Sequence, residues 1–415
     1  SAADKTTITF WHAMGGTNGE VLQQIVDDFN ASQDEIEIKA EYQGTYDDTI
    51  TKLKAAMQSD SGLPDVCQMY DVGTKFMYDS GSVIPVEDKF ESTGYDKSSV
   101  MDVISSYYTV DGKQYAMPFN VSTPMLYYNK DVFEAAGLDP ETPPTTYDEV
   151  LEDSKKIVES GAAPVGYSQA IYGWFFEQQL AGLGVTYGNN DNGRTEAVTA
   201  VDFDSNGGGL KVFDMWKKLY DSGYFEDYGT TTADTQTAFF SGQVGMIIES
   251  TAILKNAVDS SPFEVGTGYL PRIEQNDEGG VIIGGGSLWL TDTGNEANED
   301  AAWKFIEYIT TPDVQAKWSM GTGYFAINEK AYETDDMKAY LEENPNFETA
   351  INQLKDSPVN CNTAGVLSGV QTEARLTFNE IMPQVYDGKL TTQDAVDQLA
   401  ASVNKAIENY NESIK

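Results

Sequence analysis

The sequence predicts an α/β protein with two lobes, from its length, the order of its elements and one connecting stretch. The chain has 415 residues, and a single hydrophobic core stops growing at roughly 250–300 residues, so two cores are expected. Strand-like segments alternate with amphipathic helical segments near the N-terminus and again in the middle of the chain. This alternation is typical of parallel sheets covered by helices. The stretch 118–150 joins the two regions and has the composition of a hinge crossing.

The first lobe opens with a strand, a turn and a helix. Thr6–Trp11 alternates in polarity, and Thr17 and Glu20 have the spacing of a capping box ahead of apolar residues at helical intervals. A strand, a helix and a further strand are expected next, at Ile36–Tyr42, Ile50–Met57 and Asp65–Tyr70. The resulting β-α-β-α-β order predicts an α/β first lobe.

The connecting stretch begins with a strand and ends with a capped helix. Thr123–Asn129 is β-branched and aromatic, and Asp131–Gly137 predicts a short helix that a glycine ends. Prolines then forbid helix until Thr146, whose spacing from Glu149 predicts a capping box and a helix that begins near Tyr147. We therefore expect this stretch to cross from one lobe to the other.

The second lobe repeats the alternation. Helices are predicted over Tyr147–Ser160, Leu210–Ser222 and Thr391–Tyr410, and Ala233–Ser241 precedes a strand over Val244–Ile248. The glycine triplet 284–286 follows a short apolar run, and glycine permits backbone angles and close approaches that other residues do not. We interpret the triplet as a return hinge.

The charge balance makes nucleic acid a poor partner and repels anionic membrane surfaces at long range. The chain has 26 basic and 66 acidic residues, a net charge of −40, and so repels phosphate backbones. The acidic residues are spread along the chain, which indicates a solvated surface. No apolar run approaches the roughly 18 residues of a membrane span. We expect a soluble mature chain, with any signal peptide or lipidated cysteine upstream of Ser1.

The sequence shows no metal, cofactor or catalytic signature. Cys67 and Cys361 lack metal-site spacing and are either buried free thiols, which we favour, or a disulfide. The polar run 189–193 lacks the glutamate of an EF-hand, so it predicts a turn. Common hydrolase and kinase motifs do not occur, and His12 is the only histidine. A carbohydrate-active enzyme such as a glycosidase would rest only on the abundance of carboxylates.

Binding residues are better represented than catalytic ones. Aromatic residues make up 12% of the chain, and many stand beside glycines or at strand ends, where loops border a cleft. Such rings can lie against the C–H faces of sugars and polyols. The candidates are Trp11, Tyr46, Tyr70, Trp174, Trp289 and Tyr324. Core packing is favoured for Trp289, Trp303 and Trp318.

Several motifs occur in the order of a known family. The longest is YYNKDVFEAAGLDPETPPTTYDEV (127–150). The others are ITFWHAMGG (8–16), FFSGQVGMIIES (239–250), IIGGGSLWL (282–290), AAWKFIEYITTPDVQAKW (301–318) and GTGYFAINEKAY (321–332). By these motifs nearly the whole chain resembles family 1 of the extracellular solute-binding proteins of ABC importers, which includes maltose- and glycerol-3-phosphate-binding proteins. The glycerol-3-phosphate-binding branch is the most similar.

The resemblance implies a two-lobed periplasmic-binding-protein fold, type II and maltose-binding-protein-like, with a ligand cleft between the lobes. Lobe 1 would comprise residues 1–121 and 286–330, and lobe 2 residues 122–285 and 331–415. Hinges are expected near 120–124, 284–286 and 327–335.

The resemblance also implies ligand-binding residues. Matching the branch's motifs gives Tyr46, Asp71, Ser122, Trp174, Ser250, Thr251, Gly285, Tyr324 and Arg375, with Trp11, His12 and Tyr172 as weaker candidates. Asp71 stands where the branch has glutamate, so its carboxylate reaches less far. The branch's tryptophan clamp is half present, because Ile171 replaces the first ring and Trp174 keeps the second. We expect Arg375 to bind a phosphate, with a surface salt bridge as the alternative.

We therefore expect the extracytoplasmic substrate-binding component of an ABC importer, a monomer without enzymatic activity or cofactor. It would lie in the periplasm or be lipid-anchored at the outer face of a bacterial cell membrane. The expected partners are an ABC permease and a small ligand, glycerol-3-phosphate or a glycerophosphodiester, captured by closure of the lobes. The alternatives are an oligosaccharide receptor of the same fold, a carbohydrate-active enzyme and a surface adhesin.

Overall fold

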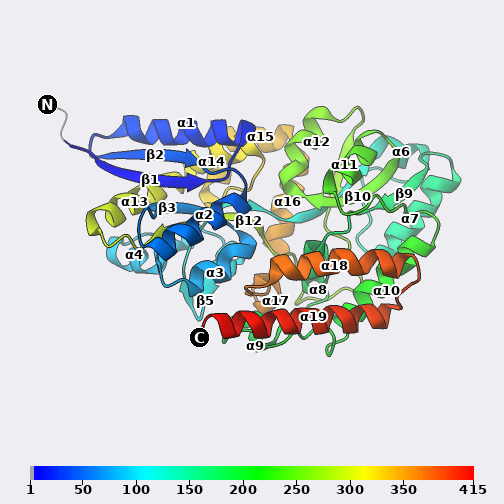
Figure 1. Ribbon diagram of the computed structural model, residues 1–415. Helices are drawn as coiled ribbons and strands as arrows, with labels where there is room; N and C mark the ends of the chain where they lie inside the picture. Colours follow the sequence, from blue (N-terminus) through cyan, green and yellow to red (C-terminus); the bar gives the residue numbers. More distant parts are fainter. Residues whose placement is uncertain (1–3) are drawn as a thin grey trace. The chain divides into compact units, whose positions relative to one another are not determined.

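The computed structural model describes residues 4–415 (Figure 1). The chain divides into two compact units. Unit 1 combines the chain up to Ser122 with Ile283–Glu343, and unit 2 combines Thr123–Ile282 with Asn344–Lys415. The chain passes between the units after Ser122, Ile282 and Glu343.

Unit 1 is built on a mixed sheet of β1 (Thr6–His12), β2 (Ile36–Tyr42), β3 (Val66–Tyr70), β4 (Val83–Ile84), β7 (Met117–Ser122) and β12 (Gly284–Thr291). β1 lies parallel to its neighbours β2 and β3, as the predicted β-α-β-α-β opening requires. β12 is antiparallel to β3, β4 and β7. Its first residues therefore lie beside the ends of β3 and β7, where Gly286 pairs with Tyr70 and Gly284 with Ser122.

The longer helices of unit 1 are α1 (Gly16–Ser32), α2 (Tyr46–Ser59), α3 (Thr74–Asp79), α4 (Val86–Thr93), α13 (Glu296–Ile309), α14 (Pro312–Thr322) and α15 (Asp335–Glu343). Short elements complete the unit: α5 (Asp102–Ser105), the hairpin β5 (Thr109–Val110) and β6 (Lys113–Gln114), and the 3₁₀ turns η1 (Asp71–Gly73), η2 (Lys97–Ser99), η3 (Ser106–Tyr108) and η5 (Glu329–Glu333).

Two predicted helix starts in unit 1 are wrong. α1 already begins at Gly16 without a side-chain cap, so Thr17 and Glu20 lie inside the helix and form no capping box. α2 begins at Tyr46, earlier than predicted, because Thr45 and Asp48 form a reciprocal capping box. This box places Tyr46 in the first turn of the helix.

The third passage between the units comes later than the span 327–335 in which we expected it. Met337, on α15, is 1% exposed and packs in a small core with Ala316, Ala326 and Ala331. Because this core holds α15 against α14, the chain stays in unit 1 until Glu343.

Unit 2 contains a second sheet, of β8 (Pro124–Asn129), β9 (Val165–Ser168), β10 (Val244–Ser250) and β11 (Val265–Gly268), in the order β11-β8-β10-β9. β8 is antiparallel to β10 and β11, and β10 is parallel to β9. The helices are α6 (Lys130–Ala135), α7 (Tyr147–Glu159), α8 (Gly173–Gly182), α9 (Asn189–Gly193), α10 (Gly208–Asp221), α11 (Thr232–Phe240), α12 (Leu254–Ser260), α16 (Pro345–Asp356), α17 (Cys361–Ala364), α18 (Gln371–Tyr386) and α19 (Thr392–Ser413), with one 3₁₀ turn, η4 (Thr251–Ile253).

A cluster of aromatic rings joins α8, α10 and α18. Phe378 of α18 lies 5.5 Å from Phe176 of α8 and 5.9 Å from Phe213 of α10, measured between ring centroids. The long helices α18 and α19 run side by side next to α10 (Figure 1). This packing fixes α8 against α18.

Several local predictions are confirmed. Thr146 caps α7 by accepting from the Glu149 N–H at 3.1 Å, and α7 begins at Tyr147. Trp289, Trp303 and Trp318 are at most 1% exposed. Cys67 and Cys361 are free thiols, but only Cys67 is buried as expected, and burial raises its pKa to about 12.

Candidate functional site

A buried asparagine organises the polar residues of unit 1. Asn120, on β7, is fully buried, and its Nδ2 donates to the Tyr46 hydroxyl at 2.7 Å. Its Oδ1 accepts from Gln68 Nε2 at 2.8 Å, and Gln68 Oε1 accepts from the Ala13 backbone N–H at 2.9 Å. This chain of bonds ties β3 and β7 to the first turn of α2. Buried, connected hydrogen bonds hold their members in one geometry.

Tyr324 joins the same asparagine. Burial raises the pKa of Tyr324, and a hydrogen bond with the Asn120 side chain partly offsets the rise. The Tyr324 ring is parallel to that of Trp318 within 6°, with 6.1 Å between centroids. Trp318 stacks in turn on Phe119, at 4.4 Å. We call Tyr46, Gln68, Asn120 and Tyr324 the Asn120 cluster.

Asp71 lies beside the Asn120 cluster, in the turn that follows β3. Burial raises the pKa of Tyr46, and the nearby Tyr324 and Asp71 raise it further. The Asp71 carboxylate accepts from the Val72 N–H at 2.9 Å, so its position is set by its own turn. Tyr70 stacks on Tyr46 with 5.2 Å between the centroids. Unit 1 thus brings together Tyr46, Asp71 and Tyr324, as the motifs predict.

Two glycines of β12 are required by the close approach of Asn120. Gly285 has a φ of +95°, and a Cβ there would lie 1.9 Å from the Asn120 carbonyl oxygen. A Cβ on Gly286 would lie 2.5 Å from Asn120 Oδ1 and 3.2 Å from the Tyr46 hydroxyl. Ser122 ends β7 opposite Gly284 and is 5% exposed. Any side chain at these glycines would displace the cluster.

Trp11 and His12 make other contacts, on β1. Trp11 Nε1 donates to Glu41 Oε2 on the neighbouring strand at 3.2 Å. His12 is 6% exposed, and its Nδ1 accepts from the Met14 N–H at 3.1 Å. Burial lowers the pKa of His12 to about 4, so the ring is neutral at neutral pH.

In unit 2, Arg375 pairs with a carboxylate that the motifs did not indicate. Its Nε donates to Glu177 Oε2 at 2.8 Å, and its Nη2 donates to Glu177 Oε1 at 2.9 Å. The side chains are 13% and 9% exposed. The guanidinium also lies 5.9 Å from the centroid of the Tyr172 ring. Arg375 therefore forms the salt bridge that we considered as an alternative, but it is buried.

The rings predicted for the ligand in unit 2 differ in exposure. Trp174 is 5% exposed and lies 5.9 Å from both the Tyr172 and Phe175 rings. Tyr172 is half-buried. Trp174 therefore packs in the core of unit 2, and Tyr172 is the more exposed ring of the two.

Ser250 and Thr251 end β10 and bond to backbone groups. Ser250 Oγ accepts from the Ala252 N–H at 3.0 Å, and Thr251 Oγ1 accepts from the Thr123 N–H at 3.0 Å. A hydroxyl that accepts one bond keeps a proton to donate. Both side chains therefore keep the capacity to donate to a ligand.

The predicted set omits two residues that organise the site, Asn120 and Glu177. Asn120 stands in the FNVST motif, two residues before Ser122, so the motif contained a usable signal. Glu177 is 198 positions from Arg375 in the sequence. Nothing local identifies it, because the pair exists only once α8 packs on α18.

A comparison with family models decides the classification. The model of the bacterial extracellular solute-binding proteins matches residues 24–349, which is most of the chain. The chain belongs to this family. As a solute-binding protein it is the substrate-binding component of an ABC importer and not an enzyme.

Relatives support the classification across the whole chain. The solute-binding protein is 31% identical over 417 residues to the sn-glycerol-3-phosphate-binding periplasmic protein UgpB of Escherichia coli (strain K12), covering 99% of this chain and 94% of the relative. The UgpB of Shigella flexneri serotype 5b (strain 8401) has the same identity and coverage. The predicted family and its glycerol-3-phosphate-binding branch are thus confirmed as the right group of relatives.

Solved structures confirm the periplasmic-binding-protein fold. The cyclic alpha-maltosyl-1,6-maltose binding protein from Arthrobacter globiformis has a TM-score of 0.81 at 26% identity, over 98% of this chain and 100% of that one. UgpB from Mycobacterium tuberculosis in complex with glycerophosphocholine has a TM-score of 0.81 at 21% identity, with the same coverage. The second likeness shows the fold alone.

Residues 4–415 contain neither a membrane-spanning helix nor a metal-binding group of side chains. No helix there has both the length and the apolar character needed to cross a membrane. In the same residues, no three histidine, cysteine, aspartate or glutamate side chains are grouped as a metal ion would need.

Proposed function

We propose that this solute-binding protein captures a small ligand with vicinal hydroxyl groups and that residues of both units contact it. The Asn120 cluster carries the proposal. It places two tyrosine hydroxyls around one buried amide, and the Asp71 carboxylate lies near the Tyr46 hydroxyl. A vicinal diol offers two donors and two acceptors in a small space, which suits such a set of groups.

Two ligand classes share this diol. Glycerol-3-phosphate or a glycerophosphodiester is supported by the name of the 31% identical relatives and by the position of Arg375. A neutral oligosaccharide is supported by the name of the 26% identical structure and by the pairing of Arg375 with Glu177. The classes differ in the charge of the head group and not in the diol.

We further propose that the ligand acts by favouring closure, which the ABC permease then recognises. The hinges would be the three passages after Ser122, Ile282 and Glu343. Contacts from both units favour closure because only the closed form makes all of them at once. Neither unit alone should bind well.

Titration calorimetry with a panel of ligands tests the proposal. The panel comprises glycerol-3-phosphate, glycerophosphocholine, and maltose- and xylose-based oligosaccharides, and small-angle scattering follows closure with each ligand that binds. We expect at least one member to bind and to make the protein more compact. Binding of none, or turnover of any, would contradict the proposal.

A further inference from the structure

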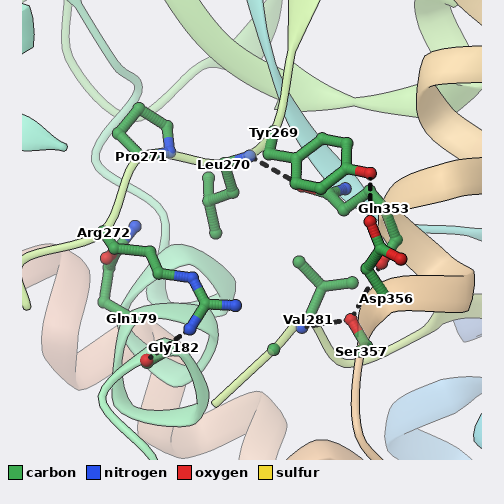
Figure 2. Close-up of a pocket in the computed structure, with 11 residues that line it drawn as sticks. Gln179, Gly182, Tyr269, Leu270, Pro271, Arg272, Val281, Gln353, Asp356 and Ser357 are labelled. Carbon is green, nitrogen blue, oxygen red and sulfur yellow. Dashed lines mark hydrogen bonds between the residues drawn. The ribbon is translucent and has the colours of Figure 1, made fainter. Parts of the chain in front are cut away.

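The three arginines of the chain differ in the groups to which they donate hydrogen bonds. Arg194 donates to the carbonyl oxygens of Ala364 and Gly365. Arg272 lines a small pocket in unit 2 and donates to the carbonyl oxygens of Gly182 and Gly279, the first of which Figure 2 shows. Both side chains therefore stabilise backbone segments of unit 2. Arg375 alone of the three stands among the predicted ligand-binding residues.

Arg375 and Glu177 are positioned for each other by their helices. A Cβ on Gly173 would lie 2.7 Å from the Arg375 Cα, so only glycine lets α18 approach the start of α8 this closely. Phe176, next to Glu177, packs on Phe378 of α18 with 5.5 Å between the ring centroids. The pair is thus part of a rigid contact between two helices.

The pair changes what Arg375 can offer a ligand. A phosphate is normally bound through the two parallel N–H groups of the guanidinium fork. Glu177 occupies the Nε/Nη2 edge of that fork, at 2.8 and 2.9 Å. Its negative charge also contributes, after burial, to raising the pKa of the neighbouring Tyr187. An incoming phosphate dianion would meet a neutralised guanidinium with a carboxylate beside it.

We propose that Glu177 is a specificity-determining residue that selects a ligand with an uncharged head group and excludes phosphomonoesters. This inference rests on the proposed function and names the ligand class as a neutral saccharide. A saccharide needs no net charge, and the half-buried Tyr172 ring beside Arg375 suits its C–H face.

Binding measurements on the wild type and Glu177→Gln test this inference. Each protein is titrated with glycerol-3-phosphate and with the saccharides of the panel. For the wild type we expect a saccharide to bind at least about tenfold more tightly than glycerol-3-phosphate. Glu177→Gln removes the carboxylate charge beside Arg375, so glycerol-3-phosphate should bind at least about tenfold more tightly than to the wild type. Glu177→Asp keeps the charge and serves as the matched control, with the selectivity of the wild type.

A measurement on the wild type alone guards against misfolding of the variants. The affinity for the best ligand should change less than about twofold between about 20 mM and about 500 mM salt, because a neutral ligand is not screened. Wild-type preference for glycerol-3-phosphate would overturn the inference and leave the proposed function standing. Binding of no panel member would overturn both.

Discussion

The side-chain amide of Asn120 donates to the hydroxyl oxygen of Tyr46 at 2.7 Å, and this bond sets the direction of the Tyr46 proton. A phenol has one proton. Because its oxygen accepts from Asn120, the proton points away from Asn120 and is offered to a ligand or to water. Burial raises the pKa of Tyr46, so the proton stays in place at neutral pH. Tyr46 therefore presents a hydrogen-bond donor on the side away from Asn120.

Removing that donor should weaken binding without disturbing the ring. For Tyr46→Phe we expect an affinity about tenfold lower, which corresponds to the loss of about 1–1.5 kcal/mol for one hydrogen bond. Tyr70→Phe is the matched control, because its ring stacks on Tyr46 while its hydroxyl donates to Asp47 at 3.0 Å. Calorimetry with the best panel ligand measures both. Equal losses in the two variants would show that the Tyr46 hydroxyl contributes no more to binding than the Tyr70 hydroxyl does.

Gly285→Ala should destabilise unit 1 by about 2–5 kcal/mol, because a Cβ at a φ of +95° costs about 1–2 kcal/mol and its clash with the Asn120 carbonyl adds overpacking. Gly294→Ala is the matched control, since Gly294 has a φ of +75° and no atom within 4 Å of the added Cβ. Gly294→Ala should lose only the about 1–2 kcal/mol that the positive φ costs. Urea denaturation followed by fluorescence compares the two. Equal losses would mean that β12 moves to accommodate the methyl group.

Much of the fold could be predicted because its signals are local. Thr146 and Glu149 stand three apart in the sequence and cap α7 as expected. The start of α1 was missed because Gly15 caps it without a side-chain bond, so its capping position carries no hydroxyl or carboxylate signal. The third passage between the units was missed because Met337 contacts residues from two other elements, which no local pattern shows.

The candidate site likewise contains residues that local motifs predict and one that they do not. Tyr46, Asp71 and Tyr324 were recognised from short motifs, and they lie together in unit 1. The role of Glu177 could not be predicted, because its partner Arg375 belongs to a different helix far along the chain. Charge compensation between distant segments depends on packing, and packing is the part of the structure that a sequence pattern describes least.

Breaking the Arg375–Glu177 pair from one side should cost more than removing both charges. Arg375→Met leaves the Glu177 carboxylate buried and unpaired, and we expect a loss of about 3–5 kcal/mol in the free energy of unfolding. The double variant Glu177→Gln/Arg375→Met has no unpaired charge and should recover at least half of that loss. Denaturant titration of the wild type, both single variants and the double variant gives the coupling. If the losses of the two single variants simply add in the double variant, the Glu177 carboxylate is stabilised by groups other than Arg375.

The stability of unit 1 should fall below pH 6.5 because of His12. Burial lowers the pKa of its imidazole from 6.5 to about 4, so the folded state binds fewer protons than the unfolded state between these values. The contribution of His12 is complete above pH 6.5 and is lost as the pH falls towards 4, about 3 kcal/mol in all.

His12→Asn isolates this effect from the carboxylates. Asparagine does not titrate, and its Oδ1 can accept from the Met14 N–H as Nδ1 of His12 does. Asp153 titrates in both proteins. Burial raises its pKa to about 6, so its contribution to the free energy of unfolding increases as the pH falls, opposite to that of His12. Its effect cancels when the free energies of unfolding of wild type and variant are subtracted at each pH. The difference should decline steadily from pH 6.5 to 4, and a difference that stays constant would show that His12 becomes protonated without cost in the folded protein.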